Sequence, residues 1–207
     1  MDKKIIFLDL DGTLTNDEKK ITPKTKEALM DIQKRGHIVA LASGRPTPGM
    51  GFIAKRAGTW KNMVDMLCHL MVEKIIDWKT KETVFENTLD RKYLPDLIRY
   101  ARQNNLGLIT YDNKQGLVAT RVDPYVMLET VKINRIPAFL TDVVKYVDYN
   151  PNKCLYTVDP EISEYHEKRL AEKFGDVLSV YRSTDYFIEI VPKELTKLHQ
   201  LKFNWQI

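Results

Sequence analysis

Two carboxylates stand one residue apart near the start of the chain: Asp9 and Asp11 flank Leu10 and precede Gly12 and Thr13. Two acids this close repel each other unless a cation or a proton lies between them, so the pair is a candidate Mg²⁺ site and a candidate nucleophile with its acid–base partner. Gly12 lets the backbone turn close to a ligand, and the hydroxyl and N–H of Thr13 could hold an oxyanion. The same pattern also fits a solvated Asp-Gly turn at the end of a strand.

A second group with chemical potential is Ser43-Gly44-Arg45. A hydroxyl and backbone N–H groups on a glycine-containing turn suit a phosphate, because neutral donors do not compete for a metal ion. Taken alone, the triplet would be an ordinary turn. Arg45 fits either a phosphate contact or a pair with a surface acid.

The elements predicted to position these groups are a strand, a helix and a second strand. Residues 5–8 form an unbroken apolar run, which is typical of a strand covered on both faces in a parallel sheet. Cap and stop signals predict a helix within residues 22–36, and residues 37–42 form a second apolar run. A right-handed parallel unit would place Ser43 beside Asp9, at the strand ends where α/β sheets bind ligands.

The rest of the chain mixes short strands with two amphipathic helices. Strands are predicted at residues 74–78, 83–86, 106–111, 117–120, 153–158 and 177–182, and helices at 90–104 and 160–173. Three polar residues at loops or strand ends, Tyr111, Asp112 and Arg121, could face a substrate or be ordinary surface residues. The pattern predicts a separate α+β region.

Residues 9–13 resemble the first motif of the haloacid dehalogenase-like (HAD) hydrolases, and the chain resembles their Cof-type branch, in which a large cap follows the second motif. The resemblance implies an α/β fold with an incomplete Rossmann-like core, built on a parallel sheet, and an inserted α+β cap domain. It implies an N-terminal part of the core at residues 1–82, a cap at 83–190, and a remnant of the return to the core at 191–207.

The activity that the resemblance implies is an Mg²⁺-dependent phosphatase of small phosphorylated metabolites such as sugar phosphates. Asp9 would form an aspartyl-phosphate, and Asp11 would protonate the leaving alcohol and then activate water. Both acids, or the backbone carbonyl of Leu10 or Asp11, would hold the metal. The phosphate would be bound by Gly12, Thr13, Ser43, Gly44 and Arg45. A phosphomutase remains open as a second enzymatic reading.

One segment departs from the family pattern, at residues 63–74. A family-like string, YGGYVMSFNGGK, written in ordinary codons and read one base later, translates as the observed MVDMLCHLMVEK. This coincidence predicts that about residues 56–74 are out of frame. The alternative is a real amphipathic helix with an apolar face of methionines and leucines, in which Cys68 and His69 would be packing or surface residues.

The second departure follows Pro192, where a lost base would account for the missing glycine of the family's pattern. Lys197 stands where the family's functional lysine belongs, so it is a third catalytic candidate that could neutralise the aspartyl-phosphate. A later acidic motif that completes the metal shell is not found after Ile190. We therefore expect impaired activity, and the competing hypothesis is a non-catalytic remnant of a frameshifted gene.

Composition sets the remaining expectations. The net charge is only +4 and lysines alternate with acids, which argues against a nucleic-acid partner. Cys68 and Cys154 lie far apart without a metal-ligand pattern, which is typical of a reducing compartment. We see no signal peptide and no apolar run of membrane-spanning length, so a cytoplasmic protein without a membrane partner is expected. The oligomeric state is not predicted.

Overall fold

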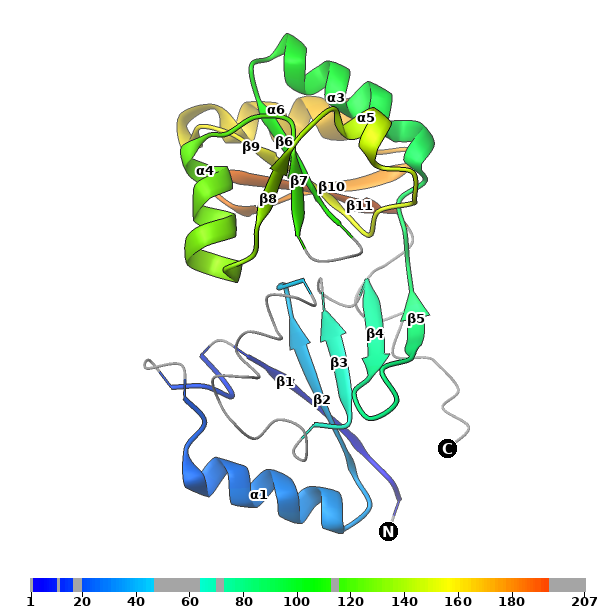
Figure 1. The fold of residues 1–207 in the computed structure, drawn as a ribbon, viewed down its shortest axis with the longest axis vertical. Coiled ribbons are helices and arrows are strands. Elements are labelled where there is room, and N and C mark those ends of the chain that lie inside the picture. The colour runs from blue at the N-terminus through cyan, green and yellow to red at the C-terminus, as the bar shows by residue number, and fades with distance from the viewer. Residues whose placement is uncertain are drawn as a thin grey trace. The chain divides into compact units, whose positions relative to one another are not determined.

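The computed structural model describes residues 2–10, 12–16, 20–46, 64–69, 73–112 and 116–193. The chain divides into two compact units, Met1–Glu86 and Asn87–Ile207. Each unit is built around its own β-sheet (Figure 1). No helix in the described ranges is both long enough and apolar enough to cross a membrane.

The first unit has a five-stranded sheet in the order β1-β2-β3-β4-β5. Its strands are β1 Ile5–Asp9, β2 Ile38–Ser43, β3 Met66–His69, β4 Lys74–Asp77 and β5 Thr83–Glu86. The first three strands run parallel to one another, and the last two pair antiparallel. The carboxyl ends of β1, β2 and β3 therefore lie at the same edge of the sheet.

Helix α1, Pro23–Lys34, connects β1 to β2 and is fixed by local signals at both ends. The Thr22 side chain accepts a hydrogen bond from the Thr25 N–H, and Gly36 follows with a φ of +84°. Leu29 joins the buried cluster formed with the sheet, whereas the neighbouring Ala28 is exposed.

Strand β1 differs from the prediction in its burial. The apolar run predicted a strand covered on both faces, but the Phe7 side chain is 37% exposed and Asp9 is exposed. The reason is its position: among the described residues β1 pairs with β2 alone, so it is an edge strand.

The helical alternative for residues 63–74 is wrong. Residues 66–69 form β3, which pairs parallel to β2 with Ser43 opposite His69. Three consecutive residues, Met66, Leu67 and Cys68, are buried. Consecutive burial is what a central strand shows, and an apolar run of this kind fits a helix face equally well by spacing alone. The reading-frame hypothesis itself stays a prediction.

The second unit has a six-stranded sheet in the order β10-β11-β9-β6-β7-β8, antiparallel except for the β7–β8 pair. Its strands are β6 Gly107–Tyr111, β7 Leu117–Ala119, β8 Ala138–Leu140, β9 Cys154–Thr157, β10 Leu178–Thr184 and β11 Phe187–Pro192. Four of these strands, β6, β7, β9 and β10, were predicted at least in part, and β8 and β11 were not.

Two helices, α3 Leu94–Gln103 and α6 Pro160–Phe174, lie on one face of this sheet (Figure 1). Their apolar sides share one buried cluster with the strands, which contains Leu97 of α3, Leu170 of α6 and Tyr156 of β9. Shorter elements complete the unit: the 3-10 turn η3 Arg91–Tyr93, α4 Pro124–Met127, the π-helix η4 Leu128–Asn134, and α5 Val143–Tyr146. Together the two units form an α/β fold, as predicted.

Candidate active site at the carboxyl ends of β1 and β2

Asp9 and Ser43 end neighbouring parallel strands. Asp9 pairs in register with Ala42, so Ser43 lies one residue farther along β2. Since both strands run the same way, both side chains stand at the sheet edge where the loops after the strands meet. The juxtaposition expected from the sequence is therefore found.

The carboxylate of Asp9 is oriented by its own chain. The N–H of Leu10 donates to Asp9 Oδ1 at 2.8 Å, and the N–H of Leu14 donates to the Asp9 carbonyl at 3.0 Å. The side chain is exposed. Within the described residues Oδ2 has no donor, which leaves this oxygen for a ligand.

The loop after Asp9 closes on Leu10. The Leu10 carbonyl accepts both the N–H of Thr15, at 3.1 Å, and the Thr15 hydroxyl, at 2.8 Å. Leu10 and Thr15 are buried, whereas Gly12, with a φ of +82°, and Thr13 are exposed at the tip. The loop thus combines an exposed turn at Gly12 and Thr13 with a buried, hydrogen-bonded base at Leu10 and Thr15.

Ser43 is buried to 3% exposure, and its Oγ accepts the N–H of Arg45 at 3.2 Å. Within the described part of the chain this hydroxyl has no acceptor for its own proton, which can therefore go to a ligand oxygen. Gly44 is exposed and Arg45 half-buried in the turn that follows. Two of the predicted catalytic residues, Asp11 and Lys197, lie outside the described residues.

The model of the haloacid dehalogenase-like hydrolase family matches residues 6–206. The chain belongs to this family. A crystal structure of a haloacid dehalogenase-like hydrolase from Bacteroides thetaiotaomicron is 34% identical, with a TM-score of 0.84 over 97% of this chain and 75% of its own.

Two further proteins are similar to this HAD hydrolase. A Streptococcus pyogenes serotype M6 protein that bears a provisional phosphatase name is 21% identical over 98% of this chain and 75% of its own length. A solved structure described as a sugar phosphatase of HAD subclass IIB is 16% identical, with a TM-score of 0.74 over 95% of this chain and 72% of its own. The chain thus spans about three quarters of the length of these relatives.

The oxygen atoms at this edge of the HAD hydrolase can be compared with the coordination shell that Mg²⁺ prefers. This ion prefers carboxylate oxygens and retains several waters, commonly with one or two carboxylates and the substrate phosphate. Asp9 supplies one such carboxylate, while the Leu10 carbonyl, a second candidate ligand, is already used twice by Thr15. Among the described residues no group of three acids, histidines or cysteines gathers as a metal site. Asp9 therefore fits Mg²⁺ as one ligand of a water-rich shell.

Three residues of the second unit that could have faced a substrate are engaged within the unit itself. Tyr111 is buried and donates to Glu129 Oε1 at 2.6 Å; burial, and then the negative charge of Glu129, raise the pKa of this phenol. Asp112 accepts the Tyr146 hydroxyl at 3.3 Å, and Arg121 donates twice to Asn105. For Tyr111 the surface reading was therefore wrong.

A buried ion pair in the same unit was missed from the sequence. Lys153 Nζ lies 3.1 Å from Glu189 Oε2, with both side chains less than a tenth exposed. Tyr181 also donates to Glu189. Burial by itself would raise the pKa of Glu189, but Lys153, together with hydrogen bonds from Ser183 and Tyr181, outweighs burial and the pKa is lowered. The residues are far apart in sequence, so no local spacing could have indicated the pair.

Proposed function

We propose that this chain is an Mg²⁺-dependent phosphatase that hydrolyses small phosphate esters, such as sugar phosphates, through an aspartyl-phosphate on Asp9. The observation that carries the proposal is the register of β1 and β2, which brings Asp9 and Ser43 to one edge of the sheet. A carboxylate nucleophile and a neutral hydroxyl donor at adjacent strand ends suit a phosphoryl group held between them. The names of the streptococcal relative and of the subclass IIB neighbour agree with this chemistry.

In the proposed reaction, Asp9 Oδ2 attacks phosphorus in line, and the ester P–O bond breaks as the acyl-phosphate bond forms. Asp11 donates its proton to the leaving alkoxide and then takes one from the water that hydrolyses the aspartyl-phosphate. Ser43, with the backbone N–H groups of Thr13 and Gly44, holds the phosphoryl oxygens. Mg²⁺, when bound, would offset the negative charge of the phosphoryl group.

Other parts of the chain have supporting roles in this proposal. Lys197 would add a compact positive charge beside the aspartyl-phosphate, and Arg45 would contact the phosphate. We assign residues 1–82 to the core, 83–190 to a cap that excludes water from the reaction, and 191–207 to the return to the core. The two unpaired cysteines agree with a cytoplasmic location.

The decisive experiment measures release of p-nitrophenol from p-nitrophenyl phosphate by the full chain, with Mg²⁺ and with EDTA. Asp9→Asn should lower kcat by at least about 10³-fold, since the nucleophile is lost. Asp31→Asn removes an exposed carboxylate on α1 and is the matched control, expected to act like wild type. Release that persists in EDTA would refute the Mg²⁺ dependence, and no release, or equal activity of the two variants, would favour a non-catalytic remnant.

A second assay separates hydrolysis from phosphoryl transfer to a sugar. Incubation with a hexose phosphate should yield inorganic phosphate and the free sugar if the chain is a phosphatase. An isomeric sugar phosphate without free phosphate would support the phosphomutase reading.

A further inference from the structure

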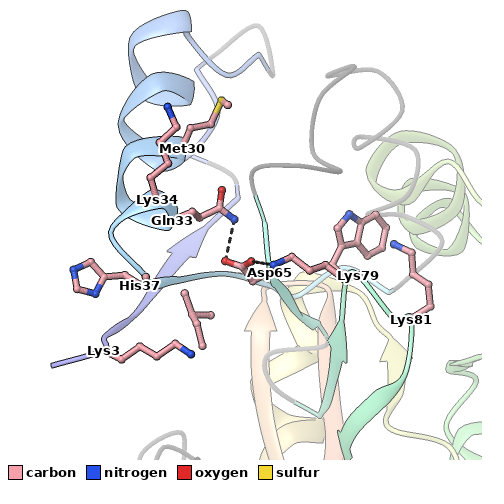
Figure 2. Close-up of a pocket in the computed structure, with 11 residues that line it drawn as sticks. Lys3, Met30, Gln33, Lys34, His37, Asp65, Lys79 and Lys81 are labelled. Carbon is pink, nitrogen blue, oxygen red and sulfur yellow. Dashed lines mark hydrogen bonds and ion pairs between the residues drawn. The ribbon is translucent and has the colours of Figure 1, made fainter. Parts of the chain in front are cut away.

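A cavity of about 830 Å³ in the first unit, at the amino ends of β1 and β2, does not gather its charges around one ligand. The carboxylate of Asp65 already accepts from protein donors, which the dashed lines of Figure 2 mark. Lys3, Lys34 and Lys81 point in different directions in the same view. Lys81 lies over the indole ring of Trp78. Among the residues that the structure describes, this cavity therefore carries no site.

Strand β8 of the second unit offers a different kind of binding surface, an open sheet edge. In the described part of the chain, β8 pairs with β7 alone (Figure 1). The Thr141 N–H donates to the Ala119 carbonyl of β7 at 3.2 Å, and the Pro137 carbonyl also accepts from β7. Backbone groups of successive strand residues alternate in direction, so Ala138 and Leu140 turn their N–H and C=O groups away from β7. Within the described ranges no hydrogen bond engages these outward groups.

The opposite edge of the same sheet, β10, is partly covered by a side chain. The Arg182 N–H donates to Glu167 Oε1 at 2.9 Å, and Arg182 Nε lies 2.9 Å from Glu167 Oε2. Folded proteins commonly protect edge strands with charges or covering side chains, since an open edge invites pairing with another strand. Strand β8 consists of alanine, phenylalanine and leucine and has no charge of its own. Its backbone is therefore available to a further strand.

The side chains around this edge are apolar and exposed. Leu140 is 60% exposed and Phe139 41%. Val131 in η4 and Val144 in α5, on the segments before and after β8, are exposed as well. A strand that covers this edge would remove apolar surface from water in addition to pairing the backbone.

We propose that β8 is a dimerisation edge, at which the chain pairs antiparallel with a second copy of itself and the two sheets become continuous. A two-fold axis through Phe139 sets Ala138 of one copy opposite Leu140 of the other, and the outward N–H and C=O groups of both pairs meet. No residue of this edge belongs to the candidate active site, so the proposal does not depend on the phosphatase activity.

Two features favour a second copy over an unrelated strand. Phe139 faces its own counterpart in a pair without hydrogen bonds, where side chains approach most closely and two aromatic rings attract each other. The same pairing brings the segment before β8, with the exposed Arg135, toward the segment after β8 of the other copy, with the exposed Asp142. The edge is thus complementary to itself in both shape and charge.

Sedimentation equilibrium of the full chain tests the association. We expect a monomer–dimer equilibrium with a Kd below about 100 μM. Leu140→Lys places a charge at the open edge and should raise the Kd at least about tenfold. Val177→Lys changes another exposed apolar residue, just before β10, and should leave the Kd within about twofold of wild type. A chain that stays monomeric at about 200 μM, or a dimer that Leu140→Lys does not weaken, would overturn the proposal.

Disulfide formation tests the register. In Phe139→Cys the two Cα atoms would lie about 4.5 Å apart across the axis, which a disulfide can span. In Leu140→Cys they would be diagonal neighbours, about 7–8 Å apart and too far for a disulfide. Mild oxidation should therefore convert only Phe139→Cys to a covalent dimer on a non-reducing gel, since the native Cys68 and Cys154 are buried.

Circular dichroism should confirm that all four variants fold. A covalent dimer of Leu140→Cys in place of Phe139→Cys would overturn the proposed pairing, and so would the absence of a covalent dimer in both.

Discussion

Gly12 and Gly36 have nearly the same backbone geometry, with φ values of +82° and +84°, and a Cβ built on either would meet no atom within 4 Å. Gly12 lies in the loop after Asp9, whereas Gly36 ends the segment after α1 at the other end of the sheet. The two positions share the same left-handed backbone and differ in their distance from the proposed chemistry.

This pair yields a matched test of the loop. Alanine at either glycine should lower the free energy of unfolding by about 1 kcal/mol, because a left-handed backbone disfavours a side chain. Only Gly12→Ala should also lower kcat/KM toward p-nitrophenyl phosphate, since it displaces the turn that carries Thr13. Denaturant titration and steady-state kinetics provide both measurements. A similar fall in activity for Gly36→Ala would show that the loop has no special role.

Asp65 is expected to be among the most sensitive acids of the first unit. Asp65→Ala would leave the Val39 N–H and Gln33 without their acceptor and Lys79 without its ion pair, and should lower the free energy of unfolding by about 2–4 kcal/mol. Asp31→Ala, which breaks only an exposed pair with Arg35, should cost less than about 1 kcal/mol. Urea titration of the two variants compares them directly; equal losses would contradict the assignment.

The buried pair of the second unit should respond differently to single and double substitution. Lys153→Met leaves Glu189 charged and buried, so we expect a loss of about 3–5 kcal/mol. Lys153→Met with Glu189→Leu replaces both charges by apolar groups and should recover most of that loss. A double variant no more stable than the single one, measured by thermal and urea unfolding, would argue that the pair itself stabilises the fold.

Acid should weaken the fold through Glu189. Its folded-state pKa lies below its ordinary value of 4.5, so its contribution to stability is complete above that pH and is lost as the pH falls through the lowered folded-state pKa. The free energy of unfolding of the wild type should therefore fall on acidification below about pH 4.5. Glu189→Gln should show a shallower fall over the same range, and an identical slope would contradict this origin.

Thiol titration tests both burial and the reading frame. Cys68 and Cys154 are buried and burial raises the pKa of each thiol to about 12, so neither should react quickly with Ellman's reagent in the native protein. Denaturation in guanidinium chloride should release two thiols per chain. Rapid native labelling would contradict the burial, and a single thiol after denaturation would indicate that residues 63–74 are read in the family-like frame.

Much of the fold could be predicted because its signals are local. Thr22 before Pro23, and Asp159 before Pro160, cap helices that begin where the sequence indicates. The sequence predicts no element within residues 121–150, because α4, η4, β8 and α5 are short and carry no clear hydrophobic period. Strand β8 is exposed throughout and exists by pairing with β7, a contact that single-sequence patterns do not contain.

In the candidate site, too, some features could be predicted from the sequence and others could not. Asp9 and Ser43 follow apolar runs, so strand ends and the handedness of the connection were enough to place them together. The exposure of β1 could not be foreseen, because an apolar run indicates a strand but not which strands flank it. Asp65 was missed because its three partners come from α1, β2 and the turn after β4.

The Leu10 carbonyl accepts two hydrogen bonds from Thr15, and these bonds bear on whether the loop could be transplanted into another protein. Apart from the β1–β2 ladder, the backbone and side-chain hydrogen bonds described between Asp9 and Thr15 join residues of that stretch to one another. Among the described residues, the geometry of the Asp9 carboxylate therefore depends on its own short segment, on pairing with the parallel strand β2, and on the buried cluster that contains Leu10 and Leu14. A segment of this kind is suited to grafting, as one unit, onto the strand ends of an unrelated α/β scaffold.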